Sequence, residues 1–250
     1  MSDSSKQTAR SPGKRLEFDL RGRQMNRIEA VSDVVFGFAL TLLVVSLQVP
    51  RTYADLVDAM HGFPAFALAF AALMVVWARH YYFFRYYGLD DPATIVLNTL
   101  LLFVVLFYAY PLKFLCTIWL SPLTGTPMEI SNAQGGMRLV MALGDQRGLM
   151  LIFGSGFAAL YFVFGAMYWH AWRVREVLHL SAFEIAHTRT SVIIETLNGG
   201  VALLSMLAAC ALKPEHAGAA GYVYFLLVPV IALWRRRRRA LEREFAPRPL

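Results

Sequence analysis

The sequence predicts an all-α, polytopic membrane protein with six transmembrane helices and both termini in the cytoplasm. First, 57% of its 250 residues are hydrophobic and only 16% are charged, whereas a soluble domain has about 25% charged residues. Second, several apolar runs exceed the roughly 20 residues that cross a bilayer as a helix, and no β-barrel alternation is present. Third, basic residues gather at both ends and in alternate loops, which is typical of membrane orientation.

The chain divides into one membrane domain and two tails. Residues 1–20 are rich in serine and basic residues and lack periodicity, so we expect a disordered cytoplasmic tail. Residues 21–240 are expected to form a single six-span domain, and residues 241–250 a second cytoplasmic tail. The expected spans cover about 27–49, 63–86, 93–120, 149–172, 188–211 and 217–234.

Helix-breaking and capping residues set the boundaries of the first three spans. Pro50 ends the first apolar run, and a short polar loop is expected over 51–62. Pro64 falls in the first turn of the second span, where a missing backbone donor costs little. Asp91 and Pro92 have the residue types of a helix cap and a first helical position, so the third span starts there.

Loops and charge set the boundaries of the last three spans. Residues 121–148 form the longest loop, in which 137–142 is a candidate for a short interfacial helix. The fourth span contains small residues that allow close helix contact, and a polar, partly helical connection over 173–187 separates it from the fifth. The arginine run Arg235–Arg239 ends the sixth span.

The basic residues predict the orientation of the chain. Six spans place both ends on one side, and the basic residues concentrate there: Lys6, Arg10, Lys14, Arg15, Arg21, Arg23, Arg85, Arg173, Arg175 and Arg235–Arg239. The excess of positive charge on cytoplasmic segments makes this side the cytoplasm. The net charge of +7 is explained by this bias, and we expect no nucleic acid partner.

The first span carries polar and ionisable residues at its start. Arg27, Ser32 and Asp33 precede an apolar run, and such groups are costly at membrane depth unless they face protein or water. The aspartate needs hydrogen-bond donors, and the candidates near the same helix ends are Arg27, Ser32, Arg79, His80 and Asn98. The group either clamps helices together or acts directly, in proton sensing or ion contact.

A second face of the first span is uncharged. On a helical wheel of roughly 100° per residue, Phe38 and Val45 share one face, with Val34 nearby and Thr41 about 60° from Phe38. Asp33 lies about 140° from Phe38. By itself, this stripe indicates a packing or lipid-facing surface, whereas the aspartate points at neighbouring helices.

The sequence contains no pattern that predicts an enzyme or a metal site. The zinc-protease motif H-E-x-x-H, a paired-cysteine set and G-x-S-x-G are all absent. Cys116 and Cys210 lie in or near apolar segments and are expected to be buried thiols. Glu195 is a second carboxylate inside a span, for which Arg189 or Arg173 is the expected partner.

The first three spans resemble a known family of ion channels. The arginine, serine and aspartate at the start of the first span resemble the R-x-x-x-F-S-D signature of the transmembrane-protein-175 potassium channels. A stretch of the second span is also similar to the W-x-x-H motif of that family. The matching residues are Arg27, Ser32, Asp33, Trp77, His80, Asn98 and Pro111. The likeness covers about residues 27–115, and the remainder agrees through the number of spans.

The resemblance implies a homotetramer of six-span subunits whose first helices line a central pore for potassium ions. In that family a ring of large aliphatic side chains narrows the pore, and a nearby threonine ring contributes to potassium preference. Carried over by position, Phe38 falls at the constriction and Thr41 at the threonine layer, with Val34 and Val45 along the same face. The resemblance also implies an inter-helix network that holds the pore helix: Arg27, Ser32, Asp33, Trp77, His80 and Asn98.

Two departures from the family pattern affect these expectations. Val31 replaces the signature phenylalanine, so the packing behind the pore helix must differ. Phe38 stands where the family has leucine or isoleucine. Four phenyl rings would either close the pore more firmly by dewetting or attract a dehydrated cation weakly.

The sequence therefore predicts a potassium-favouring cation channel in a prokaryotic plasma membrane. Its partners are potassium ions, the lipid bilayer and further copies of the chain, without cofactor or catalytic step. Two alternatives stay open. A proton-coupled secondary transporter would use Asp33, His80 and Glu195, and a non-conducting scaffold would place the first span on the periphery.

Overall fold

Six long helices account for most of the computed structural model, which describes residues 18–22, 24, 26–45, 50–124, 129–131, 137–139, 141 and 143–245. The helices are α1 (Arg27–Val45), α2 (Tyr53–Tyr87), α3 (Pro92–Thr124), α4 (Gln146–Arg173), α5 (Ala182–Ala211) and α6 (Leu227–Glu244). The other described elements are strands β1 (Glu129–Ser131) and β2 (Met137–Leu139) and the 3₁₀ segments Leu143–Asp145 and Pro214–Leu226.

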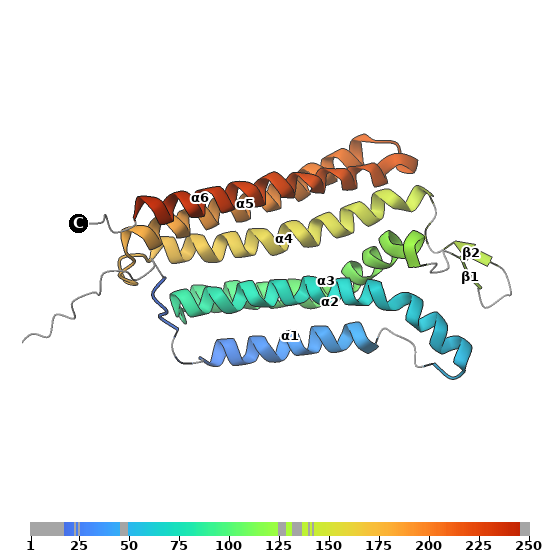
Figure 1. The fold of residues 1–250 in the computed structure, drawn as a ribbon, viewed down its shortest axis with the longest axis horizontal. Coiled ribbons are helices and arrows are strands. Elements are labelled where there is room, and N and C mark those ends of the chain that lie inside the picture. The colour runs from blue at the N-terminus through green and yellow to red at the C-terminus, as the bar shows by residue number, and fades with distance from the viewer. Residues whose placement is uncertain are drawn as a thin grey trace, which may run out of the picture.

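The helices form two groups of three that lie side by side along the long axis of the molecule (Figure 1). Helices α1, α2 and α3 make one group and α4, α5 and α6 the other, with α3 packed against α4 between them. Within the described part of the chain, six segments are long and apolar enough to cross a membrane, the last being Pro214–Glu244. This confirms the predicted helical six-span fold.

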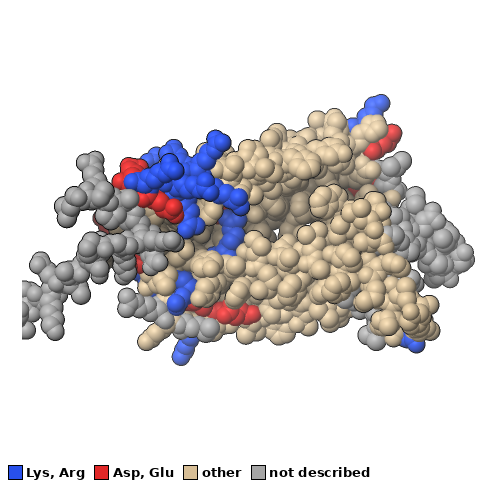
Figure 2. Space-filling view, viewed as in Figure 1, with Lys and Arg blue, Asp and Glu red and all other residues tan. Residues whose placement is uncertain are grey.

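Charged side chains are distributed unevenly along this bundle. Figure 2 shows lysine and arginine gathered at the end where α6 terminates, whereas the flank between the two ends is almost free of charge. An uncharged band of this kind fits the hydrocarbon core of a bilayer, because an unpaired charge there is costly.

The helix of the second span begins earlier than the predicted span. Thr52 caps α2: its side-chain oxygen accepts from the backbone N–H of Asp55 at 3.1 Å, and the Asp55 carboxylate accepts from the N–H of Thr52 at 3.0 Å. This reciprocal pair starts the helix at Tyr53. The predicted polar loop over 51–62 is therefore wrong from residue 53 onward.

The helical segment of the sixth span is also longer than the predicted span. It starts with the 3₁₀ segment, and α6 then continues through the arginine run to Glu244. Arginine is a good helix former, and Arg238 pairs with Glu242 one turn later at 3.0 Å. The run therefore does not end the helix, which continues into the predicted cytoplasmic tail as far as residue 244.

The longest loop contains strands where a helix was expected. Strands β1 and β2 pair antiparallel, with Glu129 opposite Leu139. The candidate helix over 137–142 is therefore wrong for residues 137–139.

The two cysteines were both expected to be buried. Cys116 is buried, but Cys210 is exposed.

A short segment before α1 packs against the helix bundle. The ring of Phe18 lies 4.6 Å from that of Tyr86 and 5.6 Å from that of His187, measured between centroids. The predicted disordered tail over 1–20 is therefore wrong for residues 18–20, while residues 1–17 lie outside the described part of the chain. We call residues 18–22 the N-terminal strap.

The strap passes so close to α2 that only glycine fits at residue 22. A Cβ atom on Gly22 would lie 2.4 Å from the carbonyl oxygen of Phe84. We expect Gly22→Ala to lower the free energy of unfolding by about 1–3 kcal/mol, measured by thermal unfolding in detergent. Gly200→Ala is the control, because a Cβ there meets nothing within 4 Å. Equal losses in the two variants would contradict this close approach.

Candidate functional site

One face of α1 is exposed along the described length of the helix. Val34 is 58% exposed, Phe38 61% and Val45 69%, and Thr41 between them is exposed as well. These positions recur every three or four residues, so they form a continuous stripe. The hydroxyl of Thr41 donates to the carbonyl oxygen of Gly37 at 2.9 Å, which leaves its lone pairs free to accept from the outside.

The opposite face of α1 is buried against α2 and α3. Its buried residues are Glu29, Ser32, Phe36, Ala39 and Leu43. The ring of Phe36 lies 5.6 Å from that of His80 on α2. Because the two faces differ so sharply, α1 has one defined rotation about its axis.

Two polar contacts fix that rotation. The indole N–H of Trp77 on α2 donates to Asp33 Oδ1 at 2.8 Å. The amide of Asn98 on α3 donates to Ser32 Oγ at 2.9 Å, and its oxygen lies 2.9 Å from His80 Nε2. Since Asn98 presents its oxygen to His80, Nε2 of His80 carries the proton in this arrangement.

Comparison with known proteins identifies the family. A family model described as endosomal/lysosomal potassium channel TMEM175 matches residues 27–108. A protein of Marivirga tractuosa named "Potassium channel" is 39% identical over 223 residues, covering 88% of this chain and 90% of its own length. The chain belongs to the TMEM175 family. Its relatives are channels and not enzymes, which confirms the expectation that it is not an enzyme.

Two solved TMEM175 structures resemble this fold. A crystal structure of a variant of the potassium channel MtTMEM175, in complex with a nanobody–MBP fusion, matches with a TM-score of 0.76 and 36% identity. The match covers 90% of this chain and 97% of that one. A homolog, from Chamaesiphon minutus, of the lysosomal potassium-selective channel TMEM175 matches with a TM-score of 0.52 and 23% identity over 84% and 96% of the two chains, which shows likeness of fold alone.

Two arginines lie elsewhere than the sequence suggested. Arg27 is exposed, and within the described residues it makes no hydrogen bond or ion pair, so the structure does not bring it to Asp33. Arg79 pairs with Glu195 on α5. The expected pairing of Glu195 with Arg189 or Arg173 is therefore wrong, because the acceptor faces α2.

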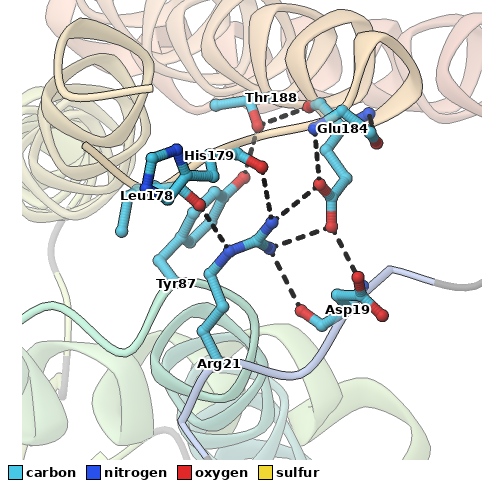
Figure 3. A network of polar contacts seen from close by, with 8 residues as sticks. Asp19, Arg21, Tyr87, Leu178, His179, Glu184 and Thr188 are labelled. Carbon is cyan, nitrogen blue, oxygen red and sulfur yellow. Dashed lines mark hydrogen bonds and ion pairs between the residues drawn. The ribbon is translucent and has the colours of Figure 1, made fainter. Parts of the chain in front are cut away.

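Sequence analysis missed an ion pair between the N-terminal strap and α5 (Figure 3). Both terminal nitrogens of Arg21 donate to the Glu184 carboxylate at 2.9 Å, and Nε donates to the carbonyl oxygen of Leu178 at 2.9 Å. Hydrogen bonding to Glu184 raises the pKa of Arg21 above its usual value. Ser181 and Glu184 form a capping box, whose S-x-x-E spacing is the local signal that could have revealed the start of α5.

Asp91 joins the start of α3 to the end of α4. Its carboxylate accepts from Thr94 Oγ1 at 2.6 Å and lies 2.9 Å from His170 Nε2. Partial burial acts to raise the pKa of Asp91, but these hydrogen bonds and the nearby His170 outweigh it and lower the pKa. Asp91 as a cap and Pro92 as the first helical residue match the sequence prediction.

The lowered pKa of Asp91 makes stability depend on pH. A carboxyl whose folded pKa lies below its unfolded value of about 3.9 stabilises the fold above that value and ceases to do so as the pH falls through the folded pKa. Asparagine keeps the cap but not the charge. Because Asp91 is part-exposed, we expect Asp91→Asn to lose only about 0.5–1 kcal/mol at pH 7 and almost nothing near pH 3, measured by unfolding at both pH values.

The neighbouring carboxylate provides the matched control. Asp90 is exposed and makes no hydrogen bond or ion pair among the described residues. Asp90→Asn should leave the unfolding free energy unchanged at both pH values. A deficit of Asp91→Asn that persists at pH 3 would contradict the assignment to its charge.

Proposed function

We propose that the chain is a potassium-favouring cation channel in which four copies surround a pore lined by α1. The observation that carries the proposal is the exposed stripe of Val34, Phe38, Thr41 and Val45. A stripe of this kind on a membrane helix meets either lipid or another copy of the chain. Membership of a family whose named members are potassium channels favours the second.

The chemistry of the stripe suits a hydrophobic constriction. Potassium has to pass four Phe38 rings, which narrow the path and exclude water when they are close together. The Thr41 layer lies about one turn further along α1, and its outward lone pairs offer oxygen ligands to the ion. Val34 and Val45 extend the uncharged wall on either side.

The contacts behind α1 support this role. Trp77 holds Asp33, and Asn98 holds Ser32, on the face of α1 that turns away from the stripe. In the channel that we propose, these bonds keep the Phe38 face turned toward the axis. The aspartate then serves to position the helix, and the ions pass along the uncharged face.

Cysteine modification in proteoliposomes tests the proposal. Phe38→Cys is made with Cys210→Ser, because Cys210 is the exposed native thiol and Cys116 is buried. A cationic methanethiosulfonate reagent should stop potassium flux through Phe38→Cys. Phe103→Cys is the control, since Phe103 on α3 is 64% exposed but lies outside the stripe. No potassium flux through the wild type, or equal loss at both sites, would contradict the pore assignment.

We also propose a plasma membrane location with both termini in the cytoplasm. The clustering of basic side chains at one end of the bundle supports this orientation (Figure 2). A C-terminal epitope tag should be cleaved by protease in inverted membrane vesicles and protected in intact spheroplasts. The reverse pattern would contradict the orientation.

A further inference from the structure

An ion pair between a part-exposed arginine and a buried glutamate connects the two helix groups within the apolar part of the bundle. Arg79 on α2 donates to Oε1 of Glu195 on α5, and the Glu195 side chain is only 3% exposed. The backbones of α2 and α5 otherwise scarcely approach each other. A second polar link, between Tyr87 and Thr188 at 2.7 Å, lies about two turns further along α2. The Arg79–Glu195 pair is the polar link to α5 among residues 77–80.

Helix α4 adds aromatic rings to the same link. The guanidinium carbon of Arg79 lies 5.1 Å from the ring centroid of Tyr161 and 5.5 Å from that of Phe164. Cations are attracted to aromatic rings at such distances, more strongly where water is excluded. One side chain of α2 is thus held by both α4 and α5.

The same stretch of α2 holds α1 from its other side. Trp77 and Arg79 are two residues apart and therefore point to nearly opposite faces of the helix. Trp77 donates to Asp33, and His80 reaches Ser32 through Asn98. Residues 77–80 consequently contact the proposed pore helix on one side and the α4–α5 pair on the other.

We propose that Arg79 and Glu195 are positioning residues for ion conduction. Their pairing sets the place of residues 77–80, and through Trp77 it sets the orientation of the pore-lining face of α1. Taking a carboxylate such as Glu195 out of water costs so much that an ion pair of this kind often gives no more stability than well-packed apolar residues would. Charges kept inside a membrane usually serve function. The inference rests on the proposed channel function.

Neutralising the pair tests the inference. The double variant Arg79→Gln/Glu195→Gln leaves no unpaired buried charge, so we expect it to fold and assemble, as checked by size-exclusion chromatography. We expect its open probability in planar bilayers to shift by about fivefold or more. Single-channel conductance and the potassium/sodium reversal potential should stay as in the wild type, because the pore-facing side chains are unchanged.

Two further variants separate coupling from general damage. Trp77→Phe removes the donor to Asp33. If both changes act through α2, the logarithm of the open probability should change less in the combined variant than the sum of the changes measured for Trp77→Phe and for the double variant separately. Arg238→Gln/Glu242→Gln removes an exposed pair on α6 as a control and should change nothing.

The outcomes keep this inference apart from the channel proposal. A silent wild type would overturn the channel itself. A conducting wild type with an unchanged open probability in the double variant would overturn only the positioning role. If the effects of Trp77→Phe and of the double variant on open probability are fully additive, the ion pair does not act on α1 through Trp77.

Discussion

Phe38→Ala should raise the potassium flux per protein by about tenfold or more. The substitution removes four phenyl rings at once from the proposed constriction, where Phe38 is 61% exposed on the protomer. A wider and wetter passage lowers the barrier to a hydrated cation. The measurement is potassium efflux from proteoliposomes at equal protein content, together with the potassium/sodium reversal potential, which should show weaker selectivity.

Phe103→Ala is the matched control for this prediction. Phe103 is similarly exposed, at 64%, but it belongs to α3. Its substitution should leave the flux unchanged. If Phe38→Ala behaves in the same way while the assembly stays intact, Phe38 does not form the constriction.

Asn98→Ala should lower the free energy of unfolding by about 3 kcal/mol, the largest stability effect that we expect. Asn98 is 3% exposed and bonds both Ser32 and His80. Alanine would leave the buried His80 donor without its acceptor and would open a small cavity between α1, α2 and α3. Chemical or thermal unfolding in detergent measures the change.

The neighbouring threonine provides the comparison. Thr99 is exposed, and among the described residues its hydroxyl bonds only the carbonyl oxygen of Ile95 one turn earlier. Thr99→Val should therefore change stability by less than about 0.5 kcal/mol. Losses of similar size in the two variants would show that the Asn98 bridge does not hold α1.

The sequence was sufficient for the fold because the membrane simplifies the problem. Apolar runs of spanning length have few alternatives to a transmembrane helix. The two faces of α1 could also be distinguished from the sequence, because the helical wheel placed Asp33 away from Phe38. In the structure Phe38 is exposed, and Asp33 accepts a hydrogen bond from Trp77. Regular helical periodicity carries that information locally.

Long-range ion pairs could not be predicted in the same way. Arg79 and Glu195 are 116 residues apart, and Arg21 and Glu184 are 163 apart. Which pairs form depends on how α2 and the strap dock on α5, and local spacing does not encode this. Of the partners suggested for Glu195, Arg189 lies earlier on α5 itself and Arg173 lies at the end of α4, whereas the actual partner is on α2.

Helix ends were misjudged where polarity was taken as a sign of a loop. Residues 51–62 are polar, yet the Thr52–Asp55 capping box starts α2 among them. The arginine run is charged, yet it continues α6. In both places the helix leaves the apolar core, and charge marks the end of the membrane-buried part only.

A density map of the purified protein in lipid nanodiscs tests the central claim most directly. We expect four copies around one axis, with α1 of each copy innermost and the Phe38 side chains closest to the axis. A single copy, or an assembly in which α1 lies on the lipid-facing periphery, would contradict the account.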